Sequence, residues 1–180
     1  MSQTLTPAAP QDLNARRHRL RRYRAVIFDM DGVITDTAGV HAQAWKELFD
    51  GALPAVGALP ANAAVVAADP DVLRPFDAAA DYLHHVDGRP REDGVRTFFA
   101  SRGLRVPEAD APEADAAPEL TVLALAERKQ GYFEQVLERD GVRVFPEAQD
   151  LLERLRAKGV PVALVTSSKN SRAVLTAGGV

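Results

Sequence analysis

The chain has 180 residues, of which 46% are hydrophobic and 26% charged, a composition that favours one folded domain with an accessory piece and excludes a disordered chain. Its 22 Lys and Arg against 25 Asp and Glu give a net charge of -3, which gives no support to a nucleic-acid-binding or membrane-surface protein. The sequence has no cysteine, so thiol chemistry is excluded, and without an apolar leader or membrane-length apolar stretch we expect a cytoplasmic protein.

The first 24 residues are polar and then basic, and they predict a tail ahead of the first strand. The basic residues of this segment are Arg16, Arg17, Arg19, Arg21, Arg22 and Arg24. A patch for an anionic partner is the alternative, but short basic runs are weakly specific. We therefore favour a solvated leader without an assigned activity.

Two short apolar runs predict the strands of a parallel sheet. Residues 25–28 are apolar and rich in β-branched and aromatic side chains, and residues 160–165 repeat this pattern, which is typical of fully buried strands. An amphipathic helix with Gly159 as its stop precedes the second run, and a polar turn and another helix follow it. This order predicts an α/β protein with a Rossmann-like core, made of residues 25–37 and 141–180.

The segment between the two strands is too long for one crossover and predicts a separate helical cap over residues 38–140. Helical patterns cover residues 40–50, 76–86, 92–102 and 118–139. Residues 51–75 are rich in Ala, Pro and Gly, and residues 107–118 are rich in Ala, Pro, Asp and Glu, so we expect flexible loops in both segments. Trp45 lies on an apolar stripe and is expected in the core, whereas His84 and His85 have no partners at ligand spacing and are expected on the surface.

Polar side chains follow both predicted strands, at the edge where open α/β sheets bind ligands. Asp29 and Asp31 come after the first strand, and the turn at residues 166–170 comes after the second. A carboxylate can attack phosphorus while its neighbour manages a proton, and a cluster of hard oxygen ligands favours Mg²⁺. Hydroxyls, a helix N-terminus and a lysine can hold a phosphate. A solvated acidic turn is the alternative for Asp29 and Asp31 alone.

The longer pattern around these aspartates carries a family resemblance. Residues 25–37 read Ala-Val-Ile-Phe-Asp-Met-Asp-Gly-Val-Ile-Thr-Asp-Thr, which resembles the first signature of the haloacid dehalogenase superfamily. With Ala38, His41, Ala44, Trp45 and Lys46, the stretch is similar to the β-phosphoglucomutase branch. Its members are phosphomutases and sugar-phosphate phosphatases. The resemblance implies a parallel-sheet core with an inserted helical cap.

The resemblance also implies a role for each core residue that matches. Asp29 would be the nucleophile that becomes an aspartyl-phosphate, and Asp31 would be the general acid and base. Both would contribute to a Mg²⁺ site. The residues that match the second, phosphate-binding signature are Thr166, Ser167, Lys169 and Asn170.

Three cap residues match positions that contact the substrate in this branch. Arg91 would grip the phosphate that is not transferred, although an exposed charged turn with Asp93 as a helix N-cap is the alternative. Lys129 would reach the sugar, with a lysine extended along the helix edge to solvent as the alternative. His41 matches a hinge residue near the nucleophile, and an ordinary histidine at a helix N-terminus is the alternative.

The expected function is therefore Mg²⁺-dependent hydrolysis of a sugar phosphate, with phosphomutase as the first alternative because both reactions would use Asp29 and Asp31. A small-molecule hexose or disaccharide phosphate is the expected partner, with no nucleic acid or membrane. The third and fourth signatures of the superfamily, a lysine and an acidic pair, have no match before Val180. We expect a fragment of a longer enzyme that is inactive or nearly so alone. A catalytically inactive binding module is the second alternative.

Overall fold

The computed structural model describes residues 24–180, apart from the side chain of Asp115; apart from Arg24, the predicted basic tail lies outside the described residues. Strand β1 (Val26–Phe28) pairs in parallel with β4 (Val162–Leu164), and Val26 lies opposite Val162. This confirms both predicted strands and their parallel arrangement. A second pair, β2 (Thr35–Asp36) and β3 (Arg143–Val144), is antiparallel and was not predicted because two-residue strands have no period to detect.

The prediction that both strands are fully buried was wrong. Ile27 is 68% exposed and Val162 is 37% exposed. Within residues 24–180, β1 and β4 form a two-stranded sheet, and Phe28 on β1 packs against Leu152 and Leu155 of α6 (Pro146–Ala157). Only one face of this sheet is covered, so an unbroken apolar run can leave half of its side chains in water.

The cap between the strands is helical, as predicted, but its helices start and end elsewhere. Its elements are α2 (Ala38–Gly57), η2 (Pro60–Asn62), α3 (Ala63–Ala68), η3 (Pro70–Leu73), the π-helix η4 (Tyr82–Val86), α4 (Arg91–Ser101), η5 (Pro112–Ala116), η6 (Pro118–Leu120) and α5 (Val122–Asp140). The predicted helices at residues 92–102 and 118–139 are confirmed as α4 and α5. The one predicted at residues 76–86 is confirmed from residue 80 onward and is wrong over residues 76–79.

The prediction of a flexible loop at residues 51–75 was wrong. Helix α2 continues to Gly57 through Pro54, and α3 and two 3-10 turns follow. Ala52, Leu53 and Val56 are almost completely buried on this extension of α2. Their burial stabilises a helix that the proline and glycine content of the segment disfavours, because tertiary packing outweighs propensity.

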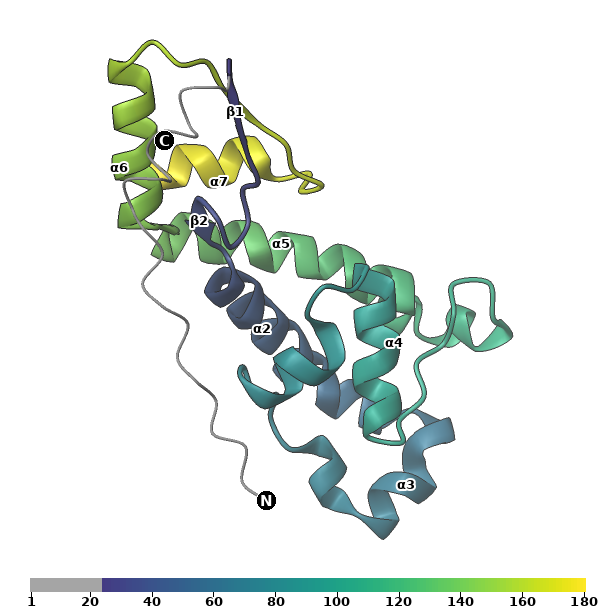
Figure 1. Cartoon of the computed structure of the whole chain (residues 1–180). Helices are drawn as coiled ribbons and strands as arrows, with labels where there is room; N and C mark the ends of the chain where they lie inside the picture. Colours follow the sequence, from purple (N-terminus) through teal and green to yellow (C-terminus); the bar gives the residue numbers. More distant parts are fainter. Residues whose placement is uncertain (1–23) are drawn as a thin grey trace, which may run out of the picture.

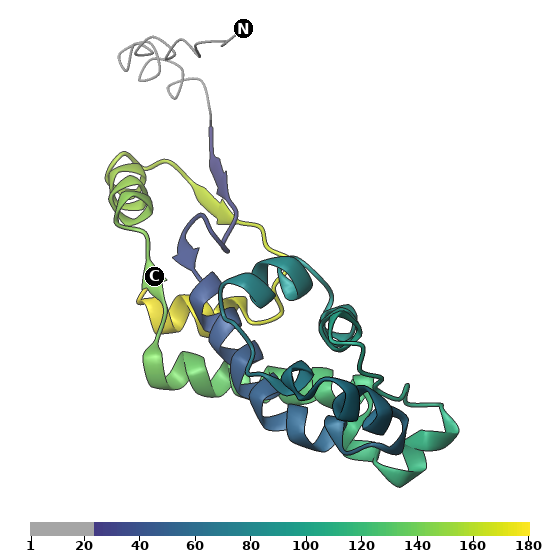
Figure 2. The same ribbon diagram turned by 90° about the horizontal axis from the view of Figure 1, so that it is seen from below.

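Aromatic side chains fill the centre of the cap. Phe49 stacks on Phe98 with ring centroids 3.9 Å apart, on Trp45 at 5.0 Å, and meets Phe99 edge-on at 5.5 Å. Trp45 is 3% exposed, which confirms its predicted place in the core. These rings join α2 to α4, and the long helices α2 and α5 lie side by side (Figures 1 and 2).

A second cluster fastens the cap to the α/β part. Met30, which follows β1, packs with Phe133 and Val136 of α5 and with Val174 of α7 (Ser171–Gly178). Helix α7 therefore rests on the C-terminal half of α5, as Figure 1 shows. This packing brings the turn ahead of α7 close to the start of α2.

Among the described residues, no single helix is long and apolar enough to cross a membrane. Helix α2 and the following segment to Ala68 meet that criterion only when taken together, and the pair is bent by 86°.

Candidate active site

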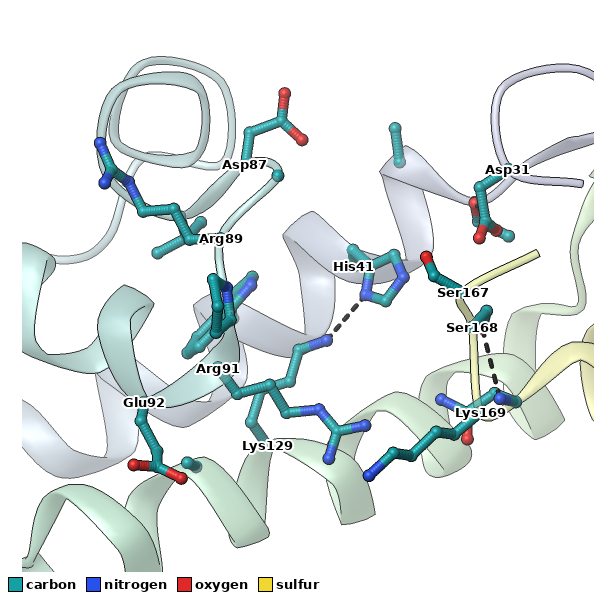
Figure 3. A pocket seen from close by; sticks show the side chains of 18 of the residues that line it. Asp31, His41, Asp87, Arg89, Arg91, Glu92, Lys129, Ser167, Ser168 and Lys169 are labelled. Atoms are coloured by element: carbon teal, nitrogen blue, oxygen red, sulfur yellow. Dashed lines mark hydrogen bonds between the residues drawn. The ribbon is translucent and has the colours of Figure 1, made fainter. Parts of the chain in front are cut away.

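A cavity of about 890 Å³ opens between the cap and the α/β part. Its walls come from the turn after β1, the start of α2, the loop from η4 to α4, helix α5 and the turn after β4. The predicted site residues that line it are Asp31, His41, Arg91, Lys129, Ser167, Lys169 and Asn170. Side chains from five separate stretches of sequence therefore meet in one place (Figure 3).

Asp31 lies at one end of the cavity, at the carboxyl end of β1. Gly32 follows it with a φ of +75°, a left-handed conformation that only glycine adopts at low cost, and its N–H donates to the Thr35 carbonyl at 2.8 Å. The buried Thr37 hydroxyl donates to Asp31 Oδ1 at 2.6 Å. This hydrogen bond ties the Asp31 carboxylate to the residue that precedes α2.

Asp29 is exposed, and the Met30 N–H donates to its Oδ1 at 2.8 Å. Neither Asp29 nor Thr166 is among the residues that line the cavity. Thr166 Oγ1 instead accepts from the Ser168 N–H at 3.0 Å within the turn after β4. Sequence reasoning had placed both residues in the site, and their assignment to it stays a prediction.

Lys129 and His41 form the middle of the cavity wall. Lys129 is 2% exposed, and its Nζ lies 2.7 Å from His41 Nδ1. The Nζ also lies over the rings of Trp45, at 5.3 Å, and Phe133, at 5.0 Å. The alternative of a lysine extended to solvent is therefore wrong. An ammonium group in this position contacts two aromatic faces and a histidine, and these contacts take the place of a carboxylate partner.

Burial and neighbouring positive charges shift both of these groups toward their neutral forms. The pKa of Lys129 falls from 10.5 to about 7, first because of burial and then because of Arg91. The pKa of His41 falls to about 3 through burial, Lys129 and Arg91, in that order. His41 is therefore neutral near pH 7 and can accept a hydrogen bond from Lys129.

The loop from η4 to α4 forms the far wall of the cavity. Arg91 is the first residue of α4, with Pro90 at the N-cap position, so the alternative that Asp93 caps this helix is wrong. Asp93 instead pairs with Arg96 at 3.0 Å on the exposed face. Figure 3 shows the Arg91 side chain beside Lys129 and extending toward Lys169, so three basic side chains lie on this side of the cavity.

Several site residues were missed at the sequence level. Tyr82, Asp87 and Ser168 line the cavity, and the pKa of Tyr82 is raised by burial, by Asp87 and by Asp31. Asp87 begins the loop from which the sequence analysis chose Arg91, and its place in that loop was the signal that could have identified it as a site residue. His84 is exposed, as predicted, whereas His85 is half-buried, 3.9 Å from Asp81.

The carboxylates at the end of β1 are the candidate ligands for Mg²⁺. Among residues 24–180 no group of three or more His, Asp or Glu side chains is arranged to hold a metal ion. Mg²⁺ often keeps several waters and is bound by one or two carboxylates together with a substrate phosphate. Asp29 and Asp31, two residues apart at the end of β1, fit that smaller donor set.

The chain is similar to known proteins over most of its length. Residues 23–178 match the family of haloacid dehalogenase-like hydrolases. The chain is 42% identical over 158 residues to the β-phosphoglucomutase of Mycobacterium bovis, covering 88% of this chain and 56% of the relative. It is 26% identical to the β-phosphoglucomutase of Bacillus subtilis, covering 84% and 54%. The chain thus spans just over half the length of these curated relatives.

Solved structures show the same fold. The CbbY protein of Rhodobacter sphaeroides, in complex with xylulose-(1,5)bisphosphate, superposes with a TM-score of 0.56 at 18% identity, covering 87% of this chain and 57% of that one. A haloacid dehalogenase hydrolase of Entamoeba histolytica gives a TM-score of 0.54 at 17% identity, covering 86% and 55%. The match over residues 23–178 shows that the chain belongs to the haloacid dehalogenase-like hydrolase family, and within that family it is similar to β-phosphoglucomutases.

Proposed function

We propose that this chain carries the cap and the nucleophile end of a Mg²⁺-dependent enzyme that removes phosphate from a sugar phosphate. One observation carries the proposal. The cavity brings a carboxylate, a polar turn before a helix and a group of cations together from stretches of sequence far apart. A phosphate monoester needs the carboxylate to attack its phosphorus, and it needs the polar turn and the cations to hold its negative charge during that attack.

The first step forms a bond between a carboxylate oxygen of Asp29 and phosphorus and breaks the bond between phosphorus and the sugar oxygen. Asp29 Oδ1 already accepts the Met30 N–H, so Oδ2 is the attacking oxygen. The leaving sugar oxygen takes a proton from the Asp31 carboxyl group, whose Oδ1 accepts the Thr37 hydroxyl. The products of this step are the free sugar and an aspartyl-phosphate.

In the second step water attacks the phosphorus of the aspartyl-phosphate, and Asp31 takes the proton that the water loses. The bond to Asp29 breaks, and inorganic phosphate leaves. Both carboxyl groups return to their starting states. If a sugar hydroxyl replaced water as the attacking group, the same residues would perform a phosphomutase reaction, which is the first alternative.

The remaining side chains hold and orient the substrate. The turn at residues 166–170 offers hydroxyls, N–H groups and the Lys169 ammonium to the transferring phosphate. Arg91 can bind a second anionic group through two parallel hydrogen bonds. Lys129 and His41, between these two positions, would contact sugar hydroxyls. The proposed substrates are therefore hexose or disaccharide phosphates, including β-glucose phosphate and trehalose phosphate.

Asp29 and Asp31 would hold the Mg²⁺ ion, which when bound neutralises phosphate charge next to the attacking carboxylate. Since no third acidic or histidine ligand joins them within residues 24–180, we expect weak Mg²⁺ affinity and slow turnover from this chain by itself. A module that binds sugar phosphates without turnover is the second alternative, and this limited donor set is what favours it.

The experiment is a thermal unfolding scan of the chain with beryllium fluoride and Mg²⁺, which mimic a phosphoryl group on a carboxylate. A ligand that binds only the folded state stabilises it by an amount that grows with the ratio of ligand concentration to dissociation constant. Each kcal/mol of this stabilisation raises the midpoint of unfolding by about 2–4 °C. We expect a rise for the original chain and for Asp110→Asn, an exposed control, and none for Asp29→Asn. A rise that persists in Asp29→Asn contradicts the proposed nucleophile.

A further inference from the structure

Lys129 is a buried basic side chain in the cavity wall without an acidic partner. It is 2% exposed, yet it lines the cavity, and its Nζ lies 2.7 Å from His41 Nδ1. The ring centroids of Trp45 and Phe133 lie 5.3 and 5.0 Å from the same nitrogen. Among the described side chains, no carboxylate pairs with it. A lysine that is desolvated or placed next to another cation is activated as a nucleophile in this way.

The charged groups around Lys129 favour its neutral amine. Burial first, and then the charge of Arg91 at the start of α4, lower the pKa of Lys129 from 10.5 to about 7. At pH 7 about half of the Lys129 side chains are therefore neutral, against about one in 3000 for a lysine with a pKa of 10.5. The carboxylates that line the cavity without raising this pKa are Asp31, Asp87, Glu92 and Glu127.

The neighbours of Lys129 leave its electron pair free and offer a place for an anion. Because the pKa of His41 is lowered to about 3, His41 is neutral, and its Nδ1 can accept one N–H of the neutral amine. The amine then keeps its electron pair for an atom in the cavity. Figure 3 shows Lys129 next to Arg91 and His41, with Lys169 on the same side. A phosphate bound by Arg91 and Lys169 would bring the rest of its molecule next to this nitrogen.

We propose that Lys129 is a nucleophilic amine that forms a Schiff base with phosphate-bearing aldehydes, a class that includes the open-chain form of aldose phosphates. The Nζ electron pair attacks the carbonyl carbon, and the carbonyl oxygen becomes the hydroxyl group of a carbinolamine. Loss of this hydroxyl group as water forms the C=N bond, and both hydrogens of the amine leave in that water molecule. The step needs no oxidant or reductant, and it does not depend on Asp29.

The test treats the full chain at pH 7 with pyridoxal 5′-phosphate, an aldehyde that carries a phosphate. Sodium cyanoborohydride reduces the C=N bond to a stable amine, and digestion followed by mass spectrometry locates it. The lysines to be followed are Lys46, Lys129, Lys158 and Lys169. We expect Lys129 to be labelled about 10- to 100-fold faster than the other lysines, because its larger neutral fraction outweighs its lower basicity. A rate at Lys129 no higher than that at the exposed Lys158 overturns the proposal.

Lys169 is the matched control within the cavity, because it lines the same cavity but is exposed. If phosphate binding alone directed the reaction, Lys169 would be labelled at least as fast as Lys129, which would contradict an activated amine. Pyridoxal, which lacks the phosphate, should label Lys129 about tenfold more slowly, since the charge-assisted hydrogen bonds to the phosphate are lost. Equal rates at Lys129 with the two aldehydes would contradict the proposed ligand class. The α-amino group of the chain, with an ordinary pKa of about 8, is the reference amine that both aldehydes should label alike.

The dependence on pH gives a second measurement that needs no variant. Above pH 7 the neutral fraction of Lys129 can only double, whereas that of an exposed lysine rises about tenfold for each pH unit. The ratio of the labelling rates of Lys129 and Lys158 should therefore fall by about 10- to 50-fold from pH 7 to pH 9. Comparing the two lysines at each pH cancels the steps of the reaction that they share. A ratio that stays constant refutes the activated amine.

The results separate this inference from the proposed function. If Lys129 is labelled preferentially while the rise with beryllium fluoride persists in Asp29→Asn, the inference stands and the proposed function fails. If the beryllium fluoride scan gives the expected result while Lys129 is labelled no faster than Lys158, the proposed function stands and the inference is refuted.

Discussion

Replacing Lys129 by methionine should stabilise the chain at neutral pH and less so at alkaline pH. In the folded state the pKa of this lysine is about 7, against 10.5 for an exposed lysine, chiefly because of burial. Below pH 7 both the folded and the unfolded states carry the proton, and the folded state bears the full cost of a buried charge. Between pH 7 and 10.5 the unfolded state binds more protons, so stability rises with pH.

The size of the effect follows from this window. One pKa unit corresponds to about 1.4 kcal/mol, which sets an upper bound of about 5 kcal/mol for the whole shift. Partial relaxation of the site reduces this bound, so we expect the stability difference between Lys129→Met and the original chain to shrink by about 1–2 kcal/mol from pH 7 to pH 9. Methionine keeps contacts with Trp45 and Phe133, while the hydrogen bond to His41 is lost at every pH.

Urea unfolding at pH 7, 8 and 9, followed by circular dichroism, measures this difference. Comparing the two proteins at each pH cancels the titration of groups that they share. Lys158→Met, at an exposed position, serves as the control and should show a difference that does not change with pH. A constant difference for Lys129→Met as well would refute the buried, uncompensated charge.

Three further predictions concern packing in the cap. At Gly94 a Cβ would lie 3.0 Å from the Trp45 ring, so Gly94→Ala should destabilise the chain by about 1–3 kcal/mol, as measured by urea unfolding. At Gly131, also helical, a Cβ would meet nothing within 4 Å, so Gly131→Ala should instead stabilise it by about 0.5–1 kcal/mol; equal effects at the two glycines would contradict the close contact. Arg102→Leu leaves the Asp81 carboxylate, now 2.8 Å from the guanidinium, buried without its partner, and should lower the midpoint of thermal unfolding by a change equivalent to about 3–5 kcal/mol. A loss below 1 kcal/mol would mean that water or Arg74 replaces Arg102.

Local sequence patterns were sufficient for the parts of the fold in which one short stretch decides its own state. The run at residues 25–28 is apolar and β-branched, and it forms β1; the apolar stripe of residues 122–140 forms α5. The aspartates and the turn at residues 166–170 could be placed at strand ends because parallel strands direct their carboxyl ends to one edge. The family resemblance added Arg91, Lys129 and His41, which line the same cavity.

Other features depend on contacts between residues far apart in the sequence. Helix α2 continues through Pro54 to Gly57 because its apolar face is buried in the cap, which its local composition does not indicate. Ile27 is exposed because the described sheet is covered on one face, although its own sequence is typical of a buried strand.

The chemistry of the site divides in the same way. The residue types, two aspartates, a hydroxyl-rich turn and scattered cations, are determined by the sequence itself. Only the tertiary structure places Lys129 against His41 and two aromatic rings, which lowers its pKa. Burial and hydrogen-bond partners are properties of neighbours in space, so a pattern along the chain specifies which groups are available and the packing of helices specifies what those groups do.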